Sequence, residues 1–285
     1  MGCHAINHAS SLQGAKLQRI HFVSGLPRAG STLLAALLRQ NPRLHAGMSG
    51  PVAGLVGSLL GEMSGRNEFS VFIDDAQRQR VLRGVIENYY ADTPAEVVFD
   101  TSRAWCARMG VLRTLYPEAR VIACVRHMPW IIDSLERLIR RNALQPSSIF
   151  NYTPGGTVYS RADGVASGEG MVGYAYNALK EAFFGEDSAN LMLLQYETLS
   201  SDPGKALAAI YEFIGEPAYA HDFAQVDYDA SAFDAKAGTP GLHTVRPKVG
   251  AIERETILPP DVFRRFGNDA FWRDPALNKR GVRIV

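Results

Sequence analysis

Short apolar runs alternate with amphipathic stretches along most of the chain. The run at residues 20–24 is rich in β-branched and aromatic side chains, as is typical of a strand buried on both faces. Leucines at helical spacing follow it, and comparable strand-like runs come later. These later runs are residues 96–100, 120–126 and 191–196. Strands that alternate with helices predict an α/β fold in three layers, with a central parallel sheet flanked by helices.

A glycine-rich turn separates the first strand from the first helix. It reads Gly25-Leu26-Pro27-Arg28-Ala29-Gly30-Ser31-Thr32. A strand, a glycine turn and a helix direct backbone N–H groups and the positive end of the helix dipole toward an anion. We interpret the stretch as a phosphate loop, which makes the predicted fold a P-loop-like one. A turn that binds no ligand is the alternative.

The loop departs from the usual pattern G-x-x-x-x-G-K-[ST] at one position. Ser31 stands where that pattern has lysine, and Arg28 is the only cation in the loop. In ATP- and GTP-hydrolysing sites the lysine contacts the β- and γ-phosphates, and the adjacent hydroxyl binds magnesium. The serine at position 31 therefore argues against an ordinary nucleoside triphosphatase.

The composition indicates one large domain without a general affinity for nucleic acid. The 285 residues include 30 Lys and Arg against 29 Asp and Glu, so any anion site must be local. The three cysteines are scattered, which favours a reducing cytoplasm over a disulfide framework. Because we find no signal-peptide pattern and no apolar run of about 18 residues, we expect a cytoplasmic protein without a membrane span. Residues 1–18 are expected to form a loose leader.

Polar side chains follow two of the later strand-like runs. Asp100, Ser102 and Arg103 come at the end of the second run, and Arg126 ends the third. Ligands of open parallel sheets bind at the carboxyl ends of the strands, so these residues are site candidates. Ser134 lies eight residues after Arg126 and could join it at a second phosphate. Helix capping by Ser102 and a solvated Arg126 are the alternatives.

Two irregular segments are candidates for closing the site. Residues 142–170 are rich in glycine and predict a lid or substrate loop, with a disordered surface insertion as the alternative. Residues 218–285 lack a clear periodicity, and we expect them to close over the bound ligand. Within them Arg246 and Lys248 lie between glycines and could form either a flap over an anion or a solvated loop.

These motifs, in this order, resemble those of the sulfotransferases that use 3′-phosphoadenosine 5′-phosphosulfate (PAPS), especially the bacterial members and the tyrosylprotein branch. Residues 26–32 are similar to their 5′-phosphosulfate loop, in which a basic residue follows the proline. Arg126 and Ser134 are similar to their 3′-phosphate pair, with the family's own separation. Tyr196-Glu197-Thr198-Leu199 resembles their late Y-E-x-L segment. The resemblance covers residues 20–217.

The resemblance implies a metal-independent enzyme that moves the sulfonyl group of PAPS in line to an acceptor hydroxyl or amine, leaving 3′,5′-adenosine bisphosphate (PAP). Arg28 would stabilise the charge on the departing bisphosphate, with backbone N–H groups of residues 29–32. The acceptor would be a small molecule or a peptide. The implied donor-binding residues are Pro27, Arg28, Ala29, Gly30, Ser31, Thr32, Arg126, Ser134, Tyr196, Arg246 and Lys248. The histidines show no metal-ligand spacing, so we expect no metal.

The general base is where the chain departs from the family pattern. The glutamate of the tyrosylprotein branch falls at Met48, which offers no carboxylate. We therefore predict Asp100 as the catalytic base, and Arg103 as a companion that binds the sulfonate or the donor. His45 is the alternative base, and Asp100 could instead hold Arg28 or Arg103 in place.

Two other functions stay open at this point. A phosphoryl-transfer kinase could use the same fold, although the missing lysine counts against it. A non-catalytic protein that binds adenosine bisphosphate could present residues 142–170 to a partner. The oligomeric state is also open, with a homodimer as one option, and the sequence does not identify the acceptor.

Overall fold

A computed structural model describes residues 18–145 and 156–285. Its centre is a six-stranded sheet in the order β2-β3-β1-β4-β5-β6. Among the described residues, all pairings between neighbouring strands are parallel. The strands are β1 (Arg19–Gly25), β2 (Leu44–Ala46), β3 (Val97–Thr101), β4 (Val121–Val125), β5 (Leu191–Gln195) and β6 (Arg283–Ile284). The predicted α/β fold with a central parallel sheet is confirmed.

The inner strands are apolar along most of their length because helices cover both faces of the sheet. Every residue of β3 and β4 is buried, and only the first residue of β1 is exposed. A parallel sheet that is covered on both faces replaces the alternation of polar and apolar residues with continuous apolar runs. For this reason the sequence pattern located β1, β3, β4 and β5.

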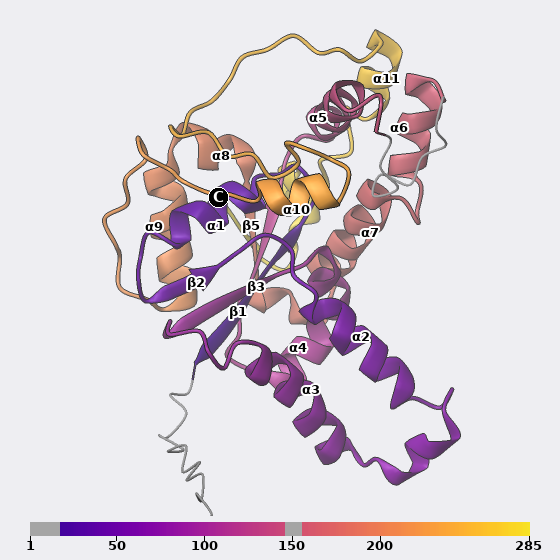
Figure 1. Cartoon of the computed structure of the whole chain (residues 1–285), viewed down its shortest axis with the longest axis vertical. Helices are drawn as coiled ribbons and strands as arrows, with labels where there is room; N and C mark the ends of the chain where they lie inside the picture. The colour runs from indigo at the N-terminus through magenta and orange to yellow at the C-terminus, as the bar shows by residue number, and fades with distance from the viewer. Residues whose placement is uncertain (1–17, 146–155) are drawn as a thin grey trace, which may run out of the picture.

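Helices surround the sheet, with α1 and α9 on one side and α4 and α7 on the other (Figure 1). The α-helices are α1 (Ser31–Leu38), α2 (Val52–Glu62), α3 (Asp75–Tyr89), α4 (Met109–Leu115), α5 (Met128–Arg141), α6 (Val158–Ala166), α7 (Met171–Phe184), α8 (Tyr196–Ser201), α9 (Pro203–Ile214), α10 (Ser231–Lys236) and α11 (Pro260–Arg265). The 3-10 helices are η1 (Glu68–Phe72), η2 (Arg103–Arg108), η4 (Glu186–Asn190), η5 (Phe271–Arg273) and η6 (Pro275–Leu277).

The register of the sheet brings the ends of its central strands to one level. Val23 of β1 is paired with Thr101 of β3, and Gly25 of β1 is paired with Cys124 of β4. The segments that follow these three strands therefore meet at one edge, which we call the carboxyl edge. Ligands of open parallel sheets bind at this edge.

Some elements differ from the sequence-based expectation. The pattern does not predict β2 or β6, because strands of three and two residues are too short to show a period. Tyr196 is the first residue of α8 and does not end a strand. Within the expected lid, residues 158–166 form the regular helix α6. Residues 146–155 of that lid, and residues 1–17 of the expected leader, lie outside the described residues.

No helix in the part of the chain that the structure describes combines the length and apolar character needed to cross a membrane.

Candidate active site

The loop between β1 and α1 depends on glycine at both of its ends. Gly25 has a φ of +100° and Gly30 a φ of +96°, both in the left-handed region that glycine favours. A Cβ atom at Gly25 would also collide with the backbone of Cys124, so the loop passes directly over the end of β4. Among the described residues, Arg28 is the only non-glycine residue with a positive φ, at 58°. Its carbonyl accepts a hydrogen bond of 3.2 Å from Nη1 of Arg126, which helps to hold this unusual backbone conformation.

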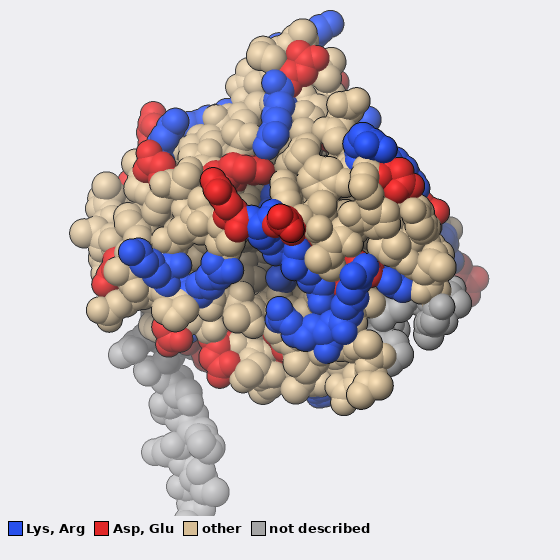
Figure 2. Space-filling model, turned by 90° about the horizontal axis from the view of Figure 1, so that it is seen from above, with Lys and Arg blue, Asp and Glu red and all other residues tan. Residues whose placement is uncertain are grey.

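A cavity of about 380 Å³ opens above this loop at the carboxyl edge of the sheet. Its described lining contains several basic side chains and no Asp or Glu. The basic lining residues are Arg28, Arg103, Arg126, Arg246, Lys248 and Arg254. Figure 2 shows Lys and Arg side chains gathered around a hollow in this face of the molecule. The local charge therefore suits an anionic ligand, although the net charge of the whole chain is only +1.

The order of the strands separates the cavity lining into two groups, one on each side of the loop. Ser102 and Arg103 follow β3, which pairs with one edge of β1. Arg126 follows β4, which pairs with the other edge of β1, and Tyr196 follows β5 beyond it. We call these the β3 side and the β4 side of the cavity.

Arg28 connects the loop to two other parts of the chain on the β4 side. Its Nε donates to Oγ of Ser134 on α5 at 3.1 Å, and its Nη1 donates to the carbonyl of Leu242. Burial, and then the nearby charge of Arg126, lower the pKa of Arg28 to about 10. The guanidinium thus keeps its proton at neutral pH and presents a poorly solvated positive charge to the cavity.

Arg126 is held against Tyr196 on the β4 side. Its guanidinium carbon lies 4.1 Å from the centroid of the Tyr196 ring, which is a cation–π contact. Burial lowers the pKa of Arg126. The structure thus brings the predicted pair of Arg126 and Ser134 into one cavity, although the hydrogen bond of Ser134 goes to Arg28.

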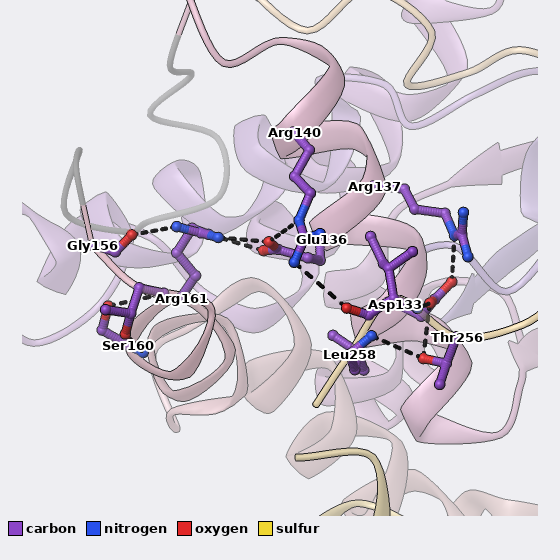
Figure 3. Close-up of polar contacts among 11 residues, drawn as sticks. Asp133, Glu136, Arg137, Arg140, Gly156, Ser160, Arg161, Thr256 and Leu258 are labelled. Atoms are coloured by element: carbon purple, nitrogen blue, oxygen red, sulfur yellow. Dashed lines mark hydrogen bonds and ion pairs between the residues drawn. The ribbon is translucent and has the colours of Figure 1, made fainter. Parts of the chain in front are cut away.

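A segment from late in the chain, residues 242–254, forms the opposite wall of the cavity; we call it the strap. Its far end is fixed to α5 by Asp133, which is fully buried next to Ser134. Oδ1 of Asp133 accepts from Oγ1 of Thr256 at 3.0 Å and from the backbone N–H of Ile257 at 2.8 Å (Figure 3). Its Oδ2 lies 2.7 Å from the guanidinium of Arg254. One buried carboxylate thus fixes the strap beside the helix that carries Ser134.

The same face of α5 also holds α6. The buried carboxylate of Glu136 accepts from Arg161 of α6 at 2.6 Å and from Arg140 of its own helix at 2.7 Å (Figure 3). Arg161 also donates to the carbonyl of Gly156. Through Glu136, α5 therefore holds α6, which belongs to the segment expected to form the lid.

The strap contributes a histidine that the sequence analysis did not select. Nδ1 of His243 lies 2.6 Å from Oδ1 of Asp234, and the backbone N–H of His243 donates to Oδ2 of the same carboxylate at 2.8 Å. Asp234 is buried on α10, and His243 lines the cavity. Asp234 also raises the pKa of Arg28, so the pair lies near the loop arginine. The two positions are nine apart in the sequence and no sequence period connects them, so their contact could not be foreseen.

Asp100, the predicted base, lies in a different environment from the one expected. Its side chain is fully buried and is not part of the cavity lining. Oδ2 accepts from the hydroxyl of Tyr90 and Oδ1 accepts from Nε1 of Trp105, both at 2.6 Å. Burial raises the pKa of Asp100, although the two hydrogen bonds oppose that shift. Within the described residues, the carboxylate of Asp100 thus has hydrogen bonds with Tyr90 and Trp105 and none with Arg28 or Arg103, and its role as the catalytic base stays a prediction.

The other predicted residues fall in different places. His45, the alternative base, lies in β2 with its ring against Tyr90 and outside the cavity lining, and burial lowers its pKa. Arg103 lines the cavity on the β3 side. Arg246 and Lys248 line the cavity from the strap, with side chains exposed to solvent.

Within the two described ranges, no group of three or more His, Cys, Asp or Glu side chains is arranged to hold a metal ion.

The family of the chain follows from a comparison of its sequence with known families. A model of the sulfotransferase family matches residues 21–221, which is more than half of the chain. The protein therefore belongs to the sulfotransferase family and is a transferase. The likeness to the tyrosylprotein branch stays a prediction that this match does not test.

Three sulfotransferases are among the solved structures to which this chain is partly similar. A sulfotransferase domain from the curacin biosynthetic pathway is 18% identical over 72% of this chain and 76% of that one, with a TM-score of 0.47. A sulfotransferase domain from the Synechococcus PCC 7002 olefin synthase is 18% identical over 90% and 96%, with a TM-score of 0.48. Sulfotransferase STF9 from Mycobacterium avium is 14% identical over 71% and 65%, with a TM-score of 0.41. A search of curated proteins found no match.

Proposed function

We propose that this sulfotransferase uses PAPS as its donor and an alcohol, phenol or amine as its acceptor, without a metal ion. The observation that carries the proposal is a lysine-free phosphate loop whose arginine, Arg28, faces a basic cavity with no carboxylate in its described lining. PAPS, when bound, supplies a sulfonyl group attached to a good leaving group, the bisphosphate. Nucleoside triphosphatases use a lysine and magnesium to bind the β- and γ-phosphates, and a donor that ends in a sulfonate does not require them.

The residues of the loop and the β4 side suit a donor with two separate anionic groups. The first N–H groups of α1 have no side-chain cap, and Gly30, Ser31 and Thr32 all line the cavity. These groups and Arg28 would hold the 5′-phosphosulfate. Arg126 and Ser134 would hold the 3′-phosphate, with Tyr196 keeping Arg126 in position. Gly25 lets this loop lie directly against β4, because a Cβ atom there would collide with the backbone of Cys124.

The acceptor would lose its proton to His243. With Nδ1–H donated to Asp234, the lone pair of Nε2 is free to accept a proton. The carboxylate fixes the ring orientation and stabilises the imidazolium that forms. Arg28 would at the same time stabilise the charge on the leaving bisphosphate. The charge of Asp234 raises the pKa of Arg28, so the two side chains are near enough to act together.

The two alternative functions are less well supported by these contacts. A kinase would need a cation at Ser31, where the structure has a hydroxyl at the start of α1. A binding protein without activity would have no use for a histidine oriented by a carboxylate beside the cavity. The cytoplasmic location and a homodimeric state remain predictions.

A comparison of ligands by thermal shift tests the donor. We expect PAP without metal to raise the Tm, because a ligand that binds only the folded state stabilises it, and ATP with magnesium to have little effect. A larger shift with ATP and magnesium would favour the kinase. Transfer of label from [³⁵S]PAPS to a mixed set of hydroxylated acceptors then separates an enzyme from a binding protein.

A further inference from the structure

Arg103 is a basic residue of the cavity to which the donor site assigns no role. It lies at the start of η2 and lines the cavity on the β3 side. Within residues 18–145 and 156–285, its guanidinium has no hydrogen bond or ion pair. Arg28 and Arg126, by contrast, each donate to groups of the chain itself. Arg103 thus presents to the cavity a cation that has no partner in the described part of the chain.

The backbone of Arg103 is firmly placed. Oγ of Ser24 donates to the carbonyl of Arg103 and accepts from the backbone N–H of Cys106, both at 3.2 Å. The preceding residue, Ser102, donates its N–H to the carbonyl of Val23 at 2.9 Å. The end of β1 therefore fixes the start of η2. The backbone that carries the side chain of Arg103 is thus already ordered, and only the side chain itself would lose freedom when a ligand binds.

The position of Arg103 separates it from the proposed donor contacts. Arg126 and Ser134 lie on the β4 side, and the guanidinium of Arg28 reaches toward Ser134 on that same side. Arg103 lies across the loop, and Ser49, which follows β2, lines the cavity on the same side as Arg103. The β3 side is therefore the part of the cavity left for the acceptor.

The electrostatic surroundings of Arg103 agree with this separation. Its pKa is lowered by burial and raised in part by Tyr174 of α7. The pKa of Arg28 responds to a different set of charges, which are those of Arg126, Tyr196, Asp234 and Arg254. A partly desolvated cation without a partner is unfavourable in the empty site, so it strongly favours an incoming anion.

We propose that Arg103 binds an anionic group on the acceptor, such as a carboxylate, so that the enzyme prefers hydroxylated acids to neutral alcohols. This inference rests on the proposed PAPS-dependent function. A planar guanidinium can bind a carboxylate through two parallel hydrogen bonds, which would also orient the acceptor hydroxyl toward His243. Arg103 is thus a specificity-determining residue, and the earlier prediction that it binds the sulfonate or the donor is the competing explanation.

The first experiment separates these two roles of Arg103. The affinities for PAPS and for PAP are measured by calorimetry in the wild type, in Arg103→Gln and in the control Arg113→Gln, whose side chain pairs with Asp187 on the surface. Our proposal expects Arg103→Gln to leave both affinities within roughly twofold of the wild type. A selective loss of PAPS affinity, with PAP unaffected, would show that Arg103 contacts the sulfonate and would overturn the proposal.

The second experiment tests the preference itself. Pairs of aromatic and aliphatic hydroxy acids and their amides are titrated into the PAP-saturated protein and assayed with PAPS. We expect the acid of at least one pair to bind roughly tenfold more tightly than its amide in the wild type and in Arg113→Gln, and this difference to vanish in Arg103→Gln. Equal behaviour of acids and amides in the wild type, including no binding of either, would overturn the proposal.

The two experiments also distinguish failure of this inference from failure of the proposed function. If neither PAPS nor PAP binds the wild type, the donor assignment is wrong and the inference falls with it. If both bind but acids have no advantage over amides, only the role of Arg103 is wrong.

Discussion

Asp234 contacts His243 through both of its carboxylate oxygens. Oδ1 lies 2.6 Å from the ring nitrogen Nδ1, and Oδ2 accepts a hydrogen bond of 2.8 Å from the backbone N–H. The two contacts orient the imidazole, and because a carboxylate accepts hydrogen bonds, Nδ1 is the nitrogen that donates, while Nε2 has no hydrogen bond among the described residues. A buried aspartate is a costly way to hold an ordinary surface loop, since a carboxylate loses solvation on burial. The pair is better explained by a requirement for one defined orientation of the histidine.

If His243 is the base, removing its ring should affect the chemical step and not donor binding. We expect His243→Gln to lower kcat by roughly 10²- to 10⁴-fold, the usual range for loss of a general base, while the Kd for PAP stays unchanged. Asp234→Asn should cause a smaller loss of kcat because the ring remains. Steady-state assays with [³⁵S]PAPS and calorimetry with PAP measure the two effects. Lys236→Gln, on the exposed face of the same short helix, is the matched control and should behave as the wild type.

Arg28 should be needed for transfer more than for folding. Arg28→Ala removes the charge that would stabilise the leaving bisphosphate, and we expect it nearly to abolish turnover while the unfolding transition remains cooperative. Arg28→Lys keeps a charge but loses the planar donors to Ser134 and Leu242, so it should be intermediate. Substantial turnover by the alanine variant would rule out the leaving-group role.

Arg126 should contribute to donor affinity through the 3′-phosphate. We expect Arg126→Ala to weaken PAP binding by roughly 2 to 4 kcal/mol through loss of a charge-assisted hydrogen bond. Calorimetry with adenosine 5′-monophosphate, which lacks the 3′-phosphate, provides the control, because its affinity should change much less. Equal losses for both nucleotides would mean that Arg126 acts by supporting the loop backbone at Arg28.

Asp100 should matter for stability and not for catalysis. Asp100→Asn retains the shape of the side chain but cannot accept from both Tyr90 and Trp105 as the carboxylate does. We expect it to lower the free energy of unfolding by about 1–3 kcal/mol, the cost of leaving a buried partner unsatisfied. The folded variant should keep its kcat. A large loss of kcat at unchanged stability would restore Asp100 as the base.

The sheet was predictable from sequence because its signals are local. Continuous apolar runs locate β1, β3, β4 and β5, and the glycines that bracket Arg28 mark the turn between β1 and α1. Arg126 and Ser134 were predictable for the same reason, since one strand end and the next helix place them. These inferences need only neighbouring residues and the rule that ligands bind at the carboxyl edge.

The proposed base, His243, was not predictable because its position depends on how an irregular segment folds back. Asp100 lies near the end of a buried strand, as a site residue would, but the direction of its side chain depends on where Tyr90 and Trp105 lie in the folded chain. His243 lies in a segment without periodicity, and the role proposed for it rests on its contact with Asp234 on α10. Sequence spacing carries information about neither arrangement.

His21 should make the fold sensitive to acid. Burial, followed by the charges of Arg19 and Arg120, lowers its pKa from 6.5 to about 4, and its Nδ1 accepts the backbone N–H of Arg120. Between these two pH values the unfolded chain binds more protons than the folded protein, so stability is complete above pH 6.5 and falls as the pH drops toward 4. The shift corresponds to about 3 kcal/mol.

The variant His21→Asn keeps an acceptor near the position of Nδ1 but cannot take up a proton. Urea unfolding of the wild type and the variant at several pH values between 4 and 7 should show a clearly flatter pH dependence for the variant. An unchanged slope would assign the acid sensitivity to other groups.

The residues of the strap are synthesised late, after most of the sheet and the phosphate loop. The carbonyl that Arg28 contacts belongs to Leu242, which is 214 positions later in the chain. A growing chain that has emerged from the ribosome only as far as α9 already contains the first five strands and the loop, but it lacks one wall of the cavity and its histidine. The proposed donor site and base would therefore be complete only after the strap has been translated and fixed to Asp133, and a chain that ended before residue 242 would lack both Leu242 and His243.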